Sequence, residues 1–161
     1  MRPMSTIRRW HFDQLRFDVK TIQFILQTTP KNDLIIYRDG SEGWTVAEVM
    51  GHLLDCERLF VERAKLTMTH DNPELPFPDQ AEDVKKGCYR DRDPQAIFTE
   101  WQQVRDEYLA YLATIPEESW NREGRHPRYA PFSLNDQLFL ACWHDQIHIE
   151  QMTRILTEKR H

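Results

Sequence analysis

Four long stretches in which apolar residues recur every three or four positions constrain the fold of this 161-residue chain most strongly. That spacing places apolar side chains on one face of an α-helix. It predicts helices over residues 7–29, 45–69, 94–115 and 134–159. Because amphipathic helices bury their apolar faces against one another, we expect an all-α, single-domain four-helix bundle (residues 1–161), packed in an antiparallel manner around one core.

The starts of two of these helices carry capping signals. Thr45 and Glu48, and likewise Ser133 and Asp136, have the spacing at which a hydroxyl and a carboxylate satisfy exposed backbone N–H groups reciprocally. Gly51 lies inside the second helical stretch, where glycine has a conformational cost. We therefore predict two sharply defined helix starts, and a close approach of a neighbouring backbone at Gly51.

The segment between residues 70 and 92 contains three prolines and a glycine and shows little periodicity. Connections of this length without regular structure are uncommon unless they cover or line a functional site. We predict an irregular loop that acts as a lid.

Composition excludes several classes of partner. A formal net charge of −5 and scattered basic residues provide no basic surface of the kind that nucleic-acid binding requires. No 18-residue apolar run and no apolar leader core are present, so we expect neither membrane spanning nor export. Three cysteines without a CxxC pair suit a reducing compartment, and a cytoplasmic location is predicted.

Histidines supply the main candidate for chemistry. His144 and His148 lie one helical turn apart, on the apolar face of the last helical stretch, so their imidazoles can share one ion. Such a pair also occurs in plain helices and needs a third ligand. His52, beside the apolar face of the second helical stretch, can supply it from a facing helix. The competing interpretation is that these are hydrogen-bonded core histidines.

Three neutral nitrogen ligands leave a divalent ion with open coordination positions, which is typical of catalytic sites. We therefore predict one divalent transition-metal ion, such as zinc, nickel or iron, held by His52, His144 and His148. Imidazole does not discriminate among these metals.

Other polar residues near these histidines are weaker candidates for a role at the metal site. Asp55 and Asp145 are interpreted as solvated helix residues, although either could orient an imidazole. Cys56 is interpreted as a buried core cysteine rather than a ligand, and Gln151 as a residue that could hold a bound water. His126 is assigned to a surface or loop position.

Two segments carry a resemblance to a known family. They are GWTVAEVMGHLLDCE, with a histidine on the second helix, and FSLNDQLFLACWHDQIHIEQM, with the paired histidines, preceded by the His126–Pro127 dipeptide. In these segments and in its four-helix layout the chain resembles the DinB-like superfamily. The resemblance implies a bundle with one long crossover connection, a nickel, zinc or iron site, a homodimer, and in some relatives transfer reactions that use thiols such as bacillithiol, mycothiol or glutathione.

Three hypotheses of function follow. The first is a metal-dependent enzyme acting on a small-molecule substrate, in which the ion activates a low-molecular-weight thiol for S-transfer or a water for hydrolysis. The second is a non-catalytic or stress-associated protein whose metal ties two helices together. The third is a dimeric helical interaction module without metal.

Overall fold

The computed structural model of the protein describes residues 4–161, so the first three residues of the N-terminal segment lie outside it. Within this range, four long helices alternate with short elements. The elements are α1 (Thr6–Thr28), α2 (Asp33–Ile36), α3 (Val46–Thr69), α4 (Gln80–Gly87), the 3₁₀ turn η1 (Tyr89–Asp91), α5 (Pro94–Ala113), the 3₁₀ turn η2 (Glu117–Ser119), β1 (Glu123–Gly124), β2 (Phe132–Ser133) and α6 (Leu134–Glu158).

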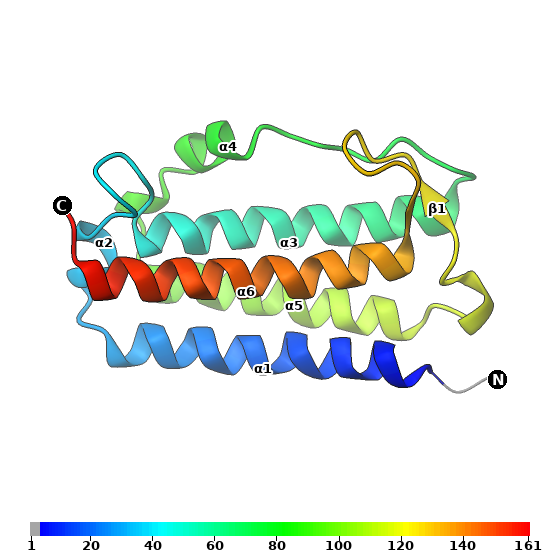
Figure 1. Cartoon of the computed structure of the whole chain (residues 1–161), viewed down its shortest axis with the longest axis horizontal. Helices are drawn as coiled ribbons and strands as arrows, with labels where there is room; N and C mark the ends of the chain where they lie inside the picture. The colour runs from blue at the N-terminus through cyan, green and yellow to red at the C-terminus, as the bar shows by residue number, and fades with distance from the viewer. Residues whose placement is uncertain (1–3) are drawn as a thin grey trace.

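The four long helices form a bundle in which α3 packs against α5 and α6, and α1 packs against α6 and α5. Figure 1 shows α3 and α5 running in the same direction, with the chain returning along the outside of the bundle between them. The prediction of antiparallel packing is therefore wrong for the α3–α5 and α1–α6 pairs. At about 1.5 Å per residue α3 is about 36 Å long, a distance that the extended connection after it can span. The expected long crossover is confirmed.

The crossover is more regular than the sequence predicted. It contains α4 and η1, in place of the irregular loop expected over residues 70–92. Asp79 caps α4 by accepting hydrogen bonds from two backbone N–H groups, and Val84 is the only buried residue of this helix. A two-turn helix with one buried side chain leaves no detectable apolar period, which explains why it was missed.

Tyr89 fastens the end of the crossover to α3. Its ring fills the space beside Gly51, where an added Cβ would lie 2.0 Å from the ring carbons. Its hydroxyl donates a hydrogen bond of 2.7 Å to Asp55 Oδ1. The close approach predicted at Gly51 therefore exists, but a side chain makes it rather than a neighbouring backbone.

Both predicted capping boxes are confirmed. Thr45 Oγ1 accepts a hydrogen bond from the Glu48 N–H, while Glu48 Oε2 accepts one of 2.8 Å from the Thr45 N–H. Ser133 and Asp136 make the same reciprocal pair at the start of α6. These caps fix the first residues of the two helices that carry the candidate histidines.

The interior consists of two apolar clusters, where the sequence predicted one core. One cluster contains Leu15, Phe60, Tyr108 and Leu138, and the other is built around residues such as Trp101. Charged and polar side chains occupy the positions between the two clusters on all four long helices. These buried residues are Asp18 on α1, Glu57 on α3, Arg105 on α5 and Asp145 on α6.

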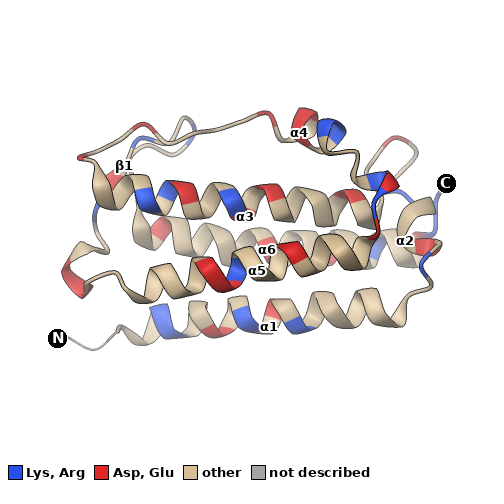
Figure 2. Ribbon diagram, turned by 180° about the vertical axis from the view of Figure 1, so that it is seen from behind, with Lys and Arg blue, Asp and Glu red and all other residues tan. Residues whose placement is uncertain are grey.

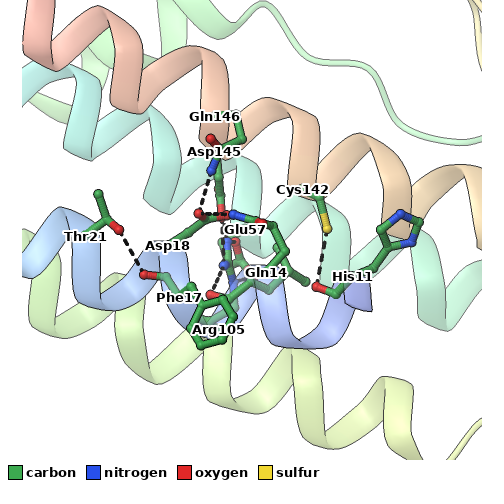
Figure 3. A network of polar contacts seen from close by, with 11 residues as sticks. His11, Gln14, Phe17, Asp18, Thr21, Glu57, Arg105, Cys142, Asp145 and Gln146 are labelled. Atoms are coloured by element: carbon green, nitrogen blue, oxygen red, sulfur yellow. Dashed lines mark hydrogen bonds and ion pairs between the residues drawn. The ribbon is translucent and has the colours of Figure 1, made fainter. Parts of the chain in front are cut away.

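Arg105 is the centre of this polar layer (Figure 3). Its guanidinium forms bidentate ion pairs with Glu57 and with Asp145, and it also donates to the Leu15 carbonyl. These five hydrogen bonds use all five guanidinium N–H groups. The indole ring of Trp101 lies 4.7 Å from the guanidinium carbon. Asp145, predicted to be solvated, is instead buried, because it provides one of the two carboxylates that neutralise Arg105.

Asp18 makes this layer sensitive to pH. Burial and the nearby Asp145 raise the pKa of the Asp18 carboxyl from 3.8 to about 7, against the opposing effect of hydrogen bonds from Gln14 and Gln146. Below pH 3.8 this carboxyl is neutral in both the folded and the unfolded chain. Between pH 3.8 and 7 only the unfolded chain ionises, so the contribution of Asp18 to stability falls as pH rises through this window.

We expect Asp18→Asn to remove this pH-dependent loss of stability. The amide stays neutral at every pH, and its oxygen can still accept hydrogen bonds from both glutamines. The variant should be more stable than the natural protein by about 2–4 kcal/mol at pH 8, with little difference near pH 4. Urea denaturation at both pH values measures the difference. The matched control is Asp13→Asn, on the same helix in a half-exposed position. Parallel pH profiles for Asp18→Asn and the natural protein would contradict the assignment.

Charged residues of both signs are interspersed along the long helices (Figure 2), as the scattered basic residues of the sequence suggested. None of the helices among residues 4–161 combines the length and the apolar character needed to cross a bilayer.

Candidate metal centre

The structure brings the three predicted histidines together from two helices. His52 projects from α3, and His144 and His148 project from successive turns of α6. The His52 ring centroid lies 5.0 Å from that of His144 and 4.6 Å from that of His148, and the α6 pair is separated by 4.5 Å. All three side chains are buried. The i, i+4 spacing in α6 and the packing of α3 against α6 account for this convergence.

The hydrogen bonds of these imidazoles are incomplete. Nε2 of His52 and Nε2 of His144 face each other at 3.0 Å, and one proton at most can lie between them. Nδ1 of His144 is buried and has no partner among the described residues. Because buried polar groups are nearly always paired, protein contacts alone leave this cluster unsatisfied.

His148 is oriented by a chain of polar contacts. Its Nδ1 lies 2.8 Å from Gln151 Oε1, so it donates to that oxygen and leaves Nε2 with a free lone pair. Gln151 Nε2 donates to Asp39, and Asp39 forms an ion pair with Arg154. The sequence suggested that Gln151 could hold a bound water; in the structure its side chain contacts His148 and favours one tautomer of that ring. No sequence motif singled out Asp39, which lies in the connection before α3.

Burial keeps all three imidazoles neutral. It lowers the pKa of His52 from 6.5 to about 3, with a smaller effect from His148. The pKa values of His144 and His148 are also lowered, in both cases chiefly by burial. Neutral imidazoles offer lone pairs without competition from protons near pH 7, which is the state that a metal ligand needs.

Cys56 lies closer to this cluster than the sequence suggested. It is buried one turn after His52, with its Sγ 3.7 Å from each His52 ring nitrogen. Donor atoms of His52, Cys56 and His144 lie within 4.8 Å of one another. Burial raises the pKa of the Cys56 thiol to about 12, so the side chain is a neutral thiol. The burial predicted for this cysteine is confirmed, and the neutral thiol would have to lose its proton before its sulfur could bind a metal.

The three histidines open onto a cavity of about 730 Å³. Its walls come from α3, α6, the start of the crossover helix and the loop between β1 and β2. The crossover therefore lines the cavity, as a lid would. Aromatic and basic side chains contribute much of the wall, and these are Trp44, Phe60, Arg63, Phe77, His126, Arg128, Tyr129 and Trp143.

Two of the weaker sequence candidates, Asp55 and His126, have surroundings that the sequence did not predict. Asp55 points to Tyr89 and anchors the crossover. His126 was assigned to a surface or loop position; it does lie in a loop, but it is buried in the cavity wall. The sequence signal that could have identified it is the cluster of aromatic residues around it, because Tyr129 and Phe132 both pack on its ring.

A family model described as the DinB superfamily matches residues 15–152, which include all three histidines. The chain belongs to the DinB superfamily. Among curated relatives, YfiT of Bacillus subtilis, which carries the name metal-dependent hydrolase, is 31% identical over 74% of this chain. The match covers 66% of the length of that relative. A protein of Oceanobacillus iheyensis with the same kind of name is 24% identical over 76% of this chain and 70% of its own length.

Solved structures show the same fold for this DinB protein. The structure of Bacillus subtilis YfiT, titled as having an unusual four-helix bundle topology, superposes with a TM-score of 0.87 at 22% identity and covers 99% of this chain and 91% of its own. A mycothiol-dependent maleylpyruvate isomerase superposes with a TM-score of 0.74 at 12% identity, over 92% of this chain and 63% of its own. The predicted all-α bundle of DinB type is confirmed.

Proposed function

We propose that this DinB protein is a metal-dependent enzyme in which His52, His144 and His148 hold one divalent transition-metal ion. The observation that carries the proposal is the convergence of three buried, neutral imidazoles that protein contacts leave partly unpaired. The donor set fits zinc, nickel and iron alike, since all three accept imidazole nitrogen. Relatives named as metal-dependent hydrolases support the metal requirement.

Protein residues around the centre perform the positioning. Gln151 and Asp39 hold the His148 ring in one tautomer, and Phe60 packs edge-on against His144 at 5.6 Å. Trp44 packs on His52 at 4.9 Å. These contacts restrain the rotation of each ring before any ligand arrives, which lowers the cost of assembling the site. A bound divalent ion supplies Lewis acidity that lowers the pKa of a water or a thiol.

Water is the nucleophile that we favour, because the curated relatives are named hydrolases. A low-molecular-weight thiol is the second candidate, because a structural neighbour is named as mycothiol-dependent. The cavity of about 730 Å³ has the volume of a small-molecule site and could admit either.

The two candidates are separated by assaying metal-loaded protein on a panel of esters and amides without thiol, and on electrophiles with added bacillithiol, mycothiol or glutathione. We expect turnover of the first panel that is lost on chelation and restored by metal. Turnover only with a thiol would transfer the assignment to S-transfer. If neither panel reacts while chelation strongly lowers the melting temperature, the non-catalytic hypothesis replaces both.

We also propose a cytoplasmic location. Cys56, Cys88 and Cys142 are all free thiols, and such thiols persist in a reducing compartment.

An apolar face supports the proposal of a homodimer. Trp10, Phe17 and Phe24 of α1 are exposed and follow a seven-residue spacing, which places them on one side of the helix. Trp10 was predicted to lie on the buried face, but it is 65% exposed. Phe139 of α6 is also exposed, and its ring lies 5.8 Å from that of His11 on α1.

We expect the natural protein to sediment as a dimer and the Trp10→Arg/Phe24→Glu variant to sediment as a monomer with an unchanged circular dichroism spectrum. Substitution of exposed apolar residues by charges opposes association without touching the core. Arg16→Glu, on the same helix, is the matched control. A monomeric natural protein would contradict the proposal.

A further inference from the structure

His126 is closely packed although it lies in a loop. Only 2% of its surface is exposed, whereas the residues that follow it are exposed. Tyr129 stacks on its ring at 4.8 Å with an interplanar angle of 19°. Phe132 and Phe77 contact the same ring at 5.0 and 5.1 Å. Because Phe77 belongs to the crossover, the imidazole is clamped between the two loops that form one side of the cavity.

One nitrogen of His126 has a partner and the other does not. The Arg128 N–H donates to Nδ1 at 3.1 Å, so Nδ1 is an acceptor and the proton of the neutral ring is on Nε2. Burial, Arg63 and Arg128 together lower the pKa of His126 to about 4, which keeps the ring neutral. Nε2 is buried and has no acceptor within residues 4–161. An unpaired buried N–H costs about 1–3 kcal/mol, and a ligand that accepts from it recovers this energy.

The wall around His126 is cationic. Arg63 is buried, and its Nε and Nη2 both donate hydrogen bonds to the Pro76 carbonyl. Arg128 stacks its guanidinium over Phe77 at 4.8 Å. Asp79 also lines the cavity, but its Oδ1 accepts two N–H groups at the start of α4. Among the donors that line the cavity, the His126 N–H is buried without an acceptor, and the two arginines add positive charge near it.

We propose that His126 Nε2–H donates a hydrogen bond to a carboxylate of the substrate, and that it thereby selects anionic small molecules for the three-histidine centre in the same cavity. This inference rests on the proposed function for the centre, but the binding that it predicts does not require turnover. An N–H donor with two guanidinium groups nearby suits the charge of a carboxylate, and the aromatic rings around it accommodate an apolar body.

The probe is benzoate, whose dissociation constant is measured by titration calorimetry on metal-loaded protein, with benzyl alcohol as the uncharged comparison. We expect His126→Phe, which keeps an aromatic ring, and His126→Asn, which places its amide near Nδ1, each to weaken benzoate binding by about tenfold or more. His126→Gln, whose amide reaches the position of Nε2, should retain most of the affinity. Binding of benzyl alcohol should not change.

His70→Phe is the matched control, because His70 is exposed at the end of α3 and outside the cavity. Metal content and melting temperature are recorded for every variant, so that loss of the metal or of the fold is distinguished from loss of the donor. If the natural protein does not bind benzoate, or if all His126 variants that fold bind it equally, the inference is overturned. Protein that cannot be loaded with metal but still binds benzoate through His126 would overturn the proposed centre alone.

Discussion

Replacing Arg105 with methionine is expected to lower the free energy of unfolding by about 3–5 kcal/mol at pH 7. The substitution leaves Glu57 and Asp145 as buried carboxylates without the cation that pairs with both. It also leaves the Leu15 carbonyl without its donor. The loss should shrink at low pH, because burial raises the pKa of Glu57 and protonation of this carboxylate removes an uncompensated charge. Urea denaturation at pH 7 and at pH 4 measures both effects.

Two further variants test the physical reason. Arg105→Lys keeps the charge but offers three N–H groups in place of five, so it should recover only part of the stability. The triple variant Arg105→Met/Glu57→Met/Asp145→Leu removes the whole network and should recover most of it, since apolar residues can replace a complete buried ion-pair cluster. An Arg105→Met variant within about 1 kcal/mol of the natural protein at pH 7 would contradict the central place of Arg105, because the loss of one partner of a buried pair costs more.

Helix positions could be predicted from the sequence because each long helix buries a continuous apolar face and two of them have capping boxes. The directions of the helices could not be derived from periodicity, which says nothing about whether a connection returns the chain along the bundle. The buried polar layer could not be predicted from the sequence either. Arg105 falls on the apolar period of its helix, whereas Asp145 was expected to be solvated, and only their mutual contact makes the burial of both charges tolerable.

The histidine cluster was predictable for a similar reason. His144 and His148 share a helix, so their spacing alone fixes their proximity, and His52 follows once α3 packs on α6. The sequence did not assign Cys56 or His126 to the functional site, because their closeness to it depends on the cavity that forms around them. His126 lies in a loop whose path is set by contacts with Phe77 of the distant crossover. Such contacts leave no periodic signal in the sequence.

Loss of a metal-ligating histidine is the second large effect that we expect. His148→Ala should weaken metal affinity by more than about 100-fold, because it removes a ligand, whereas loss of an outer partner costs about 10–100-fold. Gln151→Leu tests the loss of an outer partner, since it removes the hydrogen bond to the His148 ring but keeps the ring itself. Competition with a chromophoric chelator measures both affinities. Equal affinities for His148→Ala and the natural protein would exclude His148 as a ligand.

The most direct test of the three-histidine centre is the metal content, by plasma mass spectrometry, of protein purified without a nickel column. The natural protein is compared with His144→Ala, Cys56→Ala and the exposed control His70→Ala. We predict one transition-metal ion per chain in the natural protein, in Cys56→Ala and in His70→Ala, and none in His144→Ala. Metal retained by His144→Ala, or a natural protein that is metal-free and cannot be loaded, would contradict the central claim.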